Sequence, residues 1–230
     1  MRQCLFSVLI LVGMTSGSGA SCVDRSTFVR SIVSITREFG ADERRAEPGV
    51  LGIRGTGWFL SSRLVVTAAH VAEAMHLSTG DWKEIEVRER ESKASIPARI
   101  HALAGPHAEK MAVIELQTAL PNTVALRLRM EPLAPEEPLL SVAYPNGKLR
   151  FASGRFAQYG TGSSLAGAAL LEMHDGNDRL VLDHGASGAP VLDCEGRVVA
   201  VVSTLITQTL VLPTGRVRVS TAWQTPNVVS

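Results

Sequence analysis

Short apolar or alternating runs, separated by turn-forming residues, recur along most of this 230-residue chain. Runs of this length with Gly, Pro, Asn and Asp between them are typical of strands in an all-β sandwich or barrel. We predict strands at 28–36, 57–60, 64–67, 84–88, 96–102, 111–116, 139–144, 151–159, 169–173, 180–182, 191–192, 198–203, 209–212 and 216–219. Only residues 70–77 predict a clear helical turn.

A proline-rich, charged segment divides this series of strands. It spans residues 131–138 and has apolar runs on both sides, which suits a crossing between two subdomains. We therefore predict an N-terminal β subdomain at 21–130 and a C-terminal one at 131–230. A site assembled from both halves would lie at their interface, where clefts are common.

The first 20 residues have the features of a secretory signal peptide. Residues 1–3 are a short cationic start, residues 5–14 are mostly apolar, and residues 16–20 are small. We expect cleavage after Ala20, secretion or periplasmic localisation, and no transmembrane segment in the mature chain. An uncleaved membrane anchor is an alternative. A lipid-modified Cys22 is a weaker one, because Gly19 stands where lipoprotein signals usually have Leu.

Charge and motifs exclude several other functions. Without the leader and its Arg2, the chain has 22 basic and 22 acidic side chains, so no basic arm or stripe indicates a nucleic-acid partner. His101, His107 and His174 lack ligand-type spacing, and neither HExxH nor a paired-Cys motif occurs. We expect no metal and no cofactor.

Two cysteines remain after removal of the leader, Cys22 and Cys194. In an oxidising compartment they could form one disulfide that ties the N-terminal segment to the C-terminal half. The alternative is two unpaired thiols, because the sequence does not show whether the α-carbons come within bridging distance.

His70 differs from the other histidines by its context. It ends the segment LVVTAAH, which follows the strand-like GTGWFL, and the small residues Ala68 and Ala69 before it allow close packing of other backbone. We predict that His70 emerges where a strand changes into a helical turn and serves as a general base.

Ser187 lies in the glycine-rich turn GASGAP. Glycines on both sides of the serine permit a tight turn that points backbone N–H groups inward. The amides of Gly185 and Ser187 would then form an oxyanion hole beside the serine oxygen. An ordinary Gly/Ser/Pro β-turn would be the simpler interpretation if this stretch stood alone.

Taken together, these motifs resemble those of the trypsin-like serine peptidases, particularly the compact secreted bacterial members. The resemblance covers roughly residues 50–220 and rests on GTGWFL, LVVTAAHV, MAVIEL, VAYP, ASGRF and GASGAPVLDCEGRVVAVVS. It implies two antiparallel β-barrels with the active-site cleft between them and a peptide or protein substrate. It also implies His70 as the base, Ser187 as the nucleophile and Ser203 as a residue that positions substrate backbone.

The chain departs from this family at the residue that orients the histidine. The family has an aspartate directly before the strand that corresponds to MAVIEL, and here that position is Lys110. A lysine side chain cannot accept a hydrogen bond from the histidine. Glu109 is one residue away and would face the opposite side of a strand unless a bulge shifts the register. We therefore name Glu109 as a third catalytic residue only under that condition.

Three further positions differ from the family pattern. Ala186 replaces the acid that captures a newly cut N-terminus in some relatives, so activation of that kind is not expected. Val181 occupies the floor of the primary specificity pocket, and a pocket without a carboxylate gives no preference for Lys or Arg. Ala189 replaces a glycine and keeps the turn small.

Three functions compete at this point. The first is a secreted serine endopeptidase built on Ser187 and His70. The second is a catalytically impaired relative that binds peptide or protein, since Lys110 replaces the orienting acid. The third is an unrelated all-β binding module in which both motifs are chance turns.

Overall fold

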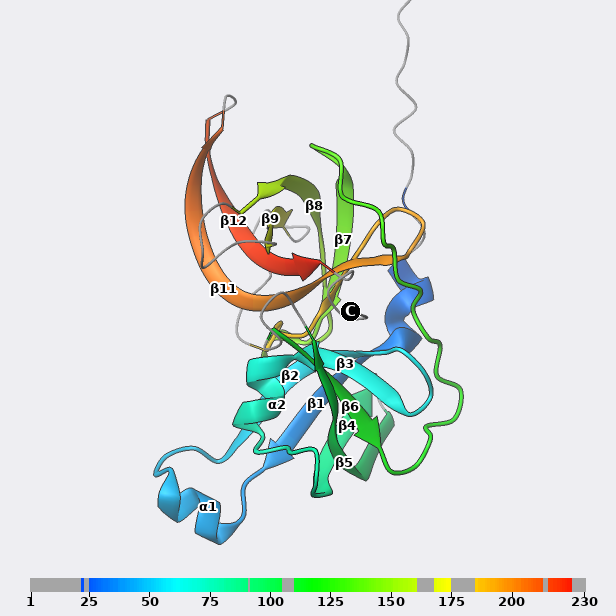
Figure 1. The fold of residues 1–230 in the computed structure, drawn as a ribbon, viewed down its shortest axis with the longest axis vertical. Coiled ribbons are helices and arrows are strands. Elements are labelled where there is room, and N and C mark those ends of the chain that lie inside the picture. The colour runs from blue at the N-terminus through cyan, green and yellow to red at the C-terminus, as the bar shows by residue number, and fades with distance from the viewer. Residues whose placement is uncertain are drawn as a thin grey trace, which may run out of the picture.

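The fold was determined as a computed structural model that describes residues 22, 25–90, 92–104, 110–160, 168–174, 185–212 and 215–224. Figure 1 shows two β-barrels, one above the other, with the connection between β6 and β7 (green) running along one side. The predicted leader, residues 1–20, and the predicted strand at 180–182 lie outside the described residues.

Strands β1–β6 form the N-terminal barrel, which closes in the order β1-β2-β3-β6-β5-β4 with antiparallel neighbours throughout. A 3₁₀ helix, η1 (Arg25–Ser31), precedes it, and two short helices, α1 (Ala41–Ala46) and α2 (Ala69–Ala74), interrupt it. The strands are β1 (Ile32–Glu38), β2 (Gly52–Phe59), β3 (Leu64–Ala68), β4 (Lys83–Glu89), β5 (Ser92–Ala104) and β6 (Met111–Leu116).

Strands β7–β12 form the C-terminal barrel, which closes in the order β10-β11-β12-β9-β8-β7. A 3₁₀ turn, η2 (Pro145–Gly147), follows its first strand. The strands are β7 (Pro138–Ala143), β8 (Arg150–Tyr159), β9 (Ala168–His174), β10 (Pro190–Leu192), β11 (Val198–Leu212) and β12 (Gly215–Gln224). The prediction of an all-β chain with two antiparallel barrels is thus confirmed.

Two of the predicted element boundaries are wrong. Residues 28–31 belong to η1 and not to a strand, because Phe28 and Val29 both turn into the interior instead of alternating. The separate strands predicted at 198–203 and 209–212 are one long strand, β11, whose register against β12 shifts twice.

Helix α1 was not predicted, because none of its residues is buried and hydrophobic periodicity therefore gives no signal. It is held by local polar contacts instead. The Glu43 carboxylate accepts the amide of Gly40 at 3.0 Å and forms an ion pair with Arg37 at 2.7 Å. These bonds lower the pKa of Glu43 to about 2. Figure 1 shows α1 projecting from the N-terminal barrel, away from the C-terminal one.

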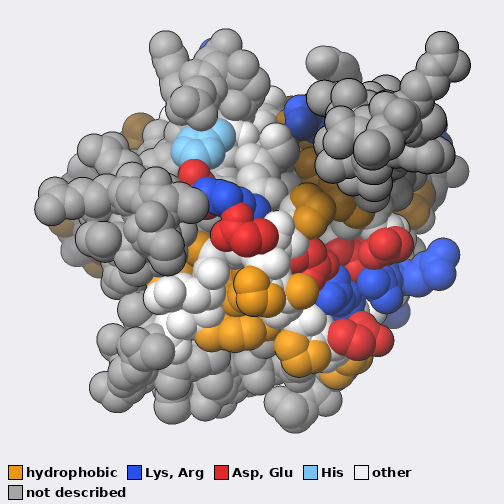
Figure 2. Space-filling view, turned by 90° about the horizontal axis from the view of Figure 1, so that it is seen from above, with side chains coloured by type: hydrophobic (Ala, Val, Ile, Leu, Met, Phe, Trp, Pro, Cys, Tyr) orange, Lys and Arg blue, Asp and Glu red, His pale blue; other side chains and the backbone are white. Residues whose placement is uncertain are grey.

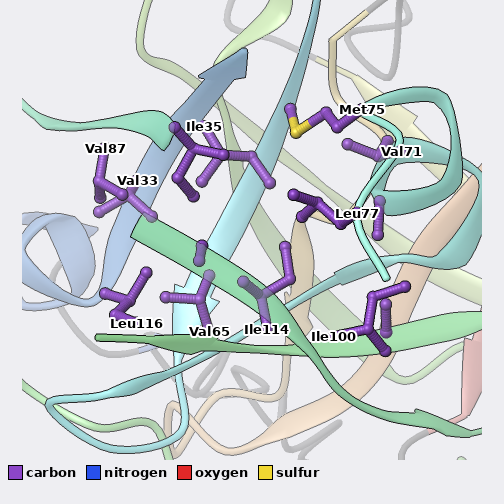
Figure 3. Close-up of a cluster of buried hydrophobic side chains, with 14 of the residues drawn as sticks. Val33, Ile35, Val65, Val71, Met75, Leu77, Val87, Ile100, Ile114 and Leu116 are labelled. Atoms are coloured by element: carbon purple, nitrogen blue, oxygen red, sulfur yellow. The ribbon is translucent and has the colours of Figure 1, made fainter. Parts of the chain in front are cut away.

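The N-terminal barrel encloses a core of aliphatic side chains from all six strands and from α2 (Figure 3). Val65 and Ile114 meet from β3 and β6, which are directly paired. Val71 and Met75 close the same core from the helical side. Full burial of one such side chain stabilises the fold by about 1.5–3 kcal/mol. This core fixes the end of β3 and the start of α2.

A second apolar cluster joins the two barrels. It combines Ile32, Trp58 and Met111 from the first barrel with Leu140 and Val201 from the second. Each of these side chains is at most 5% exposed. The barrels therefore share a continuous hydrophobic interface that fixes their relative position.

Buried ion pairs attach the inter-barrel connection to the C-terminal barrel. Asp193, 1% exposed, accepts Arg197 Nε at 2.8 Å and also contacts Arg129 Nη1 at 3.5 Å. Arg129 in turn pairs with Glu137, and this hydrogen bond raises the pKa of the guanidinium. On the face drawn in Figure 2, acidic and basic side chains likewise lie beside one another and form no expanse of a single sign among the described residues.

Cys22 and Cys194 form a disulfide, with their α-carbons 4.1 Å apart. The bond links positions separated by 172 residues and ties the chain before η1 to the turn after β10. The question that the sequence left open is thereby settled in favour of the disulfide.

Removal of this disulfide is expected to destabilise the protein substantially. Replacing both cysteines by alanine should reduce the free energy of unfolding by about 2–5 kcal/mol, because a long loop in the unfolded chain is no longer closed. Urea denaturation of the oxidised protein and of the Cys22→Ala, Cys194→Ala variant measures the difference. Dithiothreitol should lower the midpoint of the wild type only. Equal midpoints for the oxidised protein and the variant would contradict the expectation.

None of the helices among the described residues is long and apolar enough to cross a membrane.

Candidate active site

His70 is the second residue of α2, immediately after β3 ends at Ala68. Strand β3 is paired with β6, with Ala68 opposite Met111. The Ala69 amide donates to the carbonyl of Lys110 at 3.1 Å, so the start of α2 is fastened to the residue that precedes β6. His70 itself is exposed. The structure thus places it at a strand-to-helix junction, as the sequence predicts.

The pKa of His70 lies below its ordinary value. Partial desolvation by the surrounding protein is the main cause, although part of the side chain is exposed to solvent. Glu73 raises the pKa, and the nearby positive charge of Lys110 lowers it. The neutral form of the imidazole therefore predominates at pH 7. A neutral imidazole can accept a proton, which is the requirement for a general base.

The turn that carries Ser187 needs glycine at both ends. Gly185 and Gly188 have φ of +92° and +89°, a region that residues with a Cβ rarely adopt. A Cβ on Gly188 would also lie 2.0 Å from the Thr56 carbonyl oxygen and 2.2 Å from Thr67 Oγ1. The turn is consequently pressed against β2 and β3 of the other barrel, and Ser187 is half-buried there.

Several backbone groups of this turn form hydrogen bonds, either within the turn or to neighbouring strands. Gly188 N donates to Val202 at 2.6 Å, Ala189 N donates to Ala186 at 2.9 Å, and the Ser187 carbonyl accepts the Thr56 amide at 2.9 Å. Among the described residues, no acceptor takes the amides of Gly185 and Ser187. These two N–H groups are the ones predicted to bind an oxyanion, and they remain available as donors.

The structure brings the two predicted motifs together. Thr67 and Ala68, which precede His70, are the residues that Gly188 approaches, and Gly188 directly follows Ser187. Within the described part of the chain, the His70 ring and the Ser187 hydroxyl form no hydrogen bond. Such bonds are often long in unliganded enzymes and shorten when substrate binds.

Lys110 lies next to the base, as expected from the motif. Its carbonyl accepts both the Ala69 amide and, at 3.5 Å, the hydroxyl of Ser203. Ser203 is a residue of β11 and is 2% exposed. It therefore contacts the segment beside His70, while its role toward substrate stays a prediction. Glu109 and Val181 lie outside the described residues.

Ala186 and Ala189 are both completely buried and belong to the core of the C-terminal barrel. A carboxylate at position 186 would enter this apolar cluster, where an uncompensated charge is costly. This environment explains why both positions hold small apolar residues.

Sequence reasoning overlooked Thr56, which contacts the turn through both its backbone and its side chain. Its amide binds the Ser187 carbonyl and its hydroxyl binds the Gly185 carbonyl at 2.7 Å. The sequence offered one indication of this role. Thr56 is a polar residue between two glycines in GTGWFL, within a stretch of β2 whose other residues are glycine or apolar and buried.

Metal ligands do not gather in the described part of the chain: it has no group of three or more His, Cys, Asp or Glu side chains that could hold an ion.

Comparison with known proteins agrees with this arrangement. Residues 55–201 match the family model described as a trypsin-like peptidase domain. No curated protein matches the sequence.

Solved structures that resemble the chain include proteases. The active form of the Rv3671c protease from M. tuberculosis has a TM-score of 0.62 at 17% identity, with 99% of this chain and 91% of that chain covered. Its inactive form has a TM-score of 0.59 at 18% identity, covering 88% and 87%. Deg5 has a TM-score of 0.63 at 16% identity, covering 89% and 88%. At these identities the likeness shows the fold.

Proposed function

Because the chain belongs to the trypsin-like peptidase family, we propose that it is an exported serine endopeptidase with Ser187 as nucleophile and His70 as general base. The observation that carries this proposal is the packing of the GASGAP turn against the strand that leads into His70, through Gly188, Thr67 and Ala68. The two motifs lie more than 100 residues apart in the sequence and meet at the junction of the barrels.

In the first step, the Ser187 oxygen attacks the carbonyl carbon of the scissile peptide while neutral His70 takes the hydroxyl proton. The negative charge that develops on the substrate oxygen is stabilised by the amides of Gly185 and Ser187. The imidazolium then protonates the leaving amine, and an acyl ester remains on Ser187. Water, deprotonated by His70, hydrolyses the ester and restores the serine.

Export is part of the proposal. The leader at 1–20 has the pattern of a cleavable secretory signal. The disulfide between Cys22 and Cys194 supports an oxidising compartment, because such bonds persist outside the reducing cytosol. We therefore place the mature protein outside the cytoplasm, in the periplasm or the medium.

The second candidate function is binding of peptide or protein without efficient cleavage. Lys110 favours this second function. The residue lies beside His70 at the position where the family has a carboxylate, and the positive charge of Lys110 contributes to the lowered pKa of His70. A cation there opposes the imidazolium that forms during catalysis. Measured hydrolysis decides between the two candidates.

Cleavage specificity tests the proposal and the assignment of Val181 together. We expect the mature protein to cut a peptide library after small or apolar residues, because a cation without a partner in an apolar pocket is costly. Mass spectrometry of the products locates the cuts. The Val181→Asp variant should shift the preference toward Lys and Arg, with Val181→Ala as the control that enlarges the pocket without adding charge. A wild-type preference for Lys or Arg would refute the assignment of Val181, and no cleavage of any peptide would refute the proposed function.

A further inference from the structure

Thr56 lies in β2, between Gly55 and Gly57, and is completely buried. It has no place among the residues that carry out the proposed reaction. All of its polar groups are nevertheless hydrogen-bonded, and most of these bonds reach the C-terminal barrel.

The contacts divide into two sets. Toward the serine turn, the Thr56 amide donates to the Ser187 carbonyl at 2.9 Å, and Oγ1 donates to the Gly185 carbonyl at 2.7 Å. Away from the turn, Oγ1 accepts the Tyr144 amide at 2.9 Å, and the Thr56 carbonyl accepts Thr67 Oγ1 at 2.7 Å. Through its side chain and its backbone, Thr56 thus connects the serine turn, the residue before η2 and, by way of Thr67, the strand that leads to His70.

We infer that Thr56 is a positioning residue that fixes the conformation of the turn from Gly185 to Gly188. This inference rests on the proposed function, because it assigns to Thr56 the alignment of that turn for catalysis. Within this four-residue turn, the carbonyls of Gly185 and Ser187 both accept hydrogen bonds from Thr56. Rotation of the peptide after Gly185 or after Ser187 breaks one of these two bonds.

The orientation of the oxyanion donors follows from this anchoring. Gly185 supplies one donor and Ser187 the other, and Thr56 fixes the carbonyl of each residue. Because that carbonyl lies in the peptide plane that follows the donor N–H, the restraint reaches the donor through the φ and ψ angles of the same residue. Gly185 has no side chain to restrict its backbone, and glycine is free to occupy many other conformations. The Thr56 hydroxyl therefore provides the restraint that Gly185 lacks. Donors held in place before substrate arrives stabilise the oxyanion without reorganisation.

Tyr144 contributes to the same arrangement. Its amide donates to Thr56 Oγ1, which leaves the hydroxyl proton for the Gly185 carbonyl. Its own carbonyl would lie 3.1 Å from a Cβ on Gly185, so this segment borders the turn on the other side. Because serine also has a hydroxyl that accepts one bond and donates another, it can replace threonine here, whereas valine has the same shape and cannot.

The test compares Thr56→Val and Thr56→Ser with wild type and with Ser141→Ala. Ser141 is a matched control, since its buried hydroxyl donates to the Pro190 carbonyl at 2.8 Å and forms no hydrogen bond with the described residues 185–188. Thr56→Val is expected to lower kcat by about 10–100-fold with KM nearly unchanged, because the oxyanion donors are loosened and not removed. Thr56→Ser should restore most of kcat. Both Thr56→Val and Ser141→Ala should lower Tm by similar amounts, while Ser141→Ala keeps kcat.

A second measurement does not depend on catalysis. In the Ser187→Ala background, hydrogen exchange at the amides of Gly188 and Ala189 should be faster with Thr56→Val than with Thr56→Ser. Their acceptors are the carbonyls of Val202 and Ala186, to which the Thr56 side chain forms no hydrogen bond, so faster exchange reports mobility of the turn.

The inference is overturned if Thr56→Val retains the kcat of Ser141→Ala, if Thr56→Ser does not restore kcat, or if exchange in the turn is unchanged. Absence of hydrolysis in the wild type would instead refute the proposed function. In that case the exchange measurement still decides whether Thr56 fixes the turn.

Discussion

Replacement of Ser187 or His70 by alanine is expected to lower kcat by about 100-fold, because removal of a serine nucleophile or its base costs about a million-fold in a complete triad and the missing carboxylate at Lys110 already accounts for about 10⁴ of that loss. Each variant should remove about as much activity as the two together, because the two groups act as one unit in the attack on the carbonyl. Both side chains lie at the surface of the barrel junction, half-buried or exposed, so the fold should be retained.

Two matched controls separate this effect from general damage. Ser62 and His101 are exposed residues of the N-terminal barrel that belong neither to the serine turn nor to α2. Ser62→Ala and His101→Ala should retain wild-type kcat and Tm. If Ser187→Ala and His70→Ala hydrolyse peptide as well as these controls do, another pair of residues performs the chemistry.

Replacement of Lys110 by aspartate is expected to raise kcat about 10-fold or more, because loss of the orienting carboxylate costs about 10⁴ in a worked triad. The carboxylate would fix the tautomer of His70 and stabilise its charged form. Steady-state kinetics at saturating peptide measure the effect.

The same substitution should move the acid limb of the pH profile. Hydrolysis requires neutral His70 and is lost as the pH falls through its pKa, which Lys110 now helps to lower. Removing the cation and adding an anion raises that pKa, so the acid limb of kcat/KM should shift to higher pH. Lys110→Gln is the control, since it removes the charge without supplying a carboxylate. It should shift the limb less and leave kcat near that of the wild type.

Glu109→Gln completes this set of variants. If Glu109→Gln abolishes hydrolysis and Lys110→Asp does not increase it, Glu109 is the orienting carboxylate and the register before β6 is shifted. If neither substitution changes kcat, the group that orients His70 belongs to another part of the chain, and the expectation for Lys110 is wrong.

The sequence predicted those parts of the protein that depend on local pattern. Alternating apolar runs located most strands, since a strand at a barrel wall has one buried face. The strand end before His70 and the glycine turn around Ser187 could be predicted, because neighbouring residues in the sequence determine both features. Helix α1 was missed because no residue of it is buried. The end of η1 was mistaken for part of a strand because the apolar Phe28 and Val29 lie shortly before the apolar start of β1 at Ile32.

The features that sequence could not supply arise from contacts between distant segments. The hydroxyl of Thr56 meets the Gly185 carbonyl across 129 positions, and Cys22 meets Cys194 across 172. No periodicity within either segment encodes such a meeting, because it depends on how one barrel packs on the other. Ala186 illustrates the same point, since only the closed C-terminal barrel shows that its position is fully buried.

The most direct measurement of the central claim is covalent labelling of the mature protein by a peptidyl phosphonate directed at active-site serines, with the modified residue mapped by mass spectrometry. A competent nucleophile attacks phosphorus only when a base removes its proton. We predict a single adduct on Ser187 that is absent from both Ser187→Ala and His70→Ala. A wild-type protein that remains unlabelled at Ser187, or that is labelled equally well without His70, would contradict it.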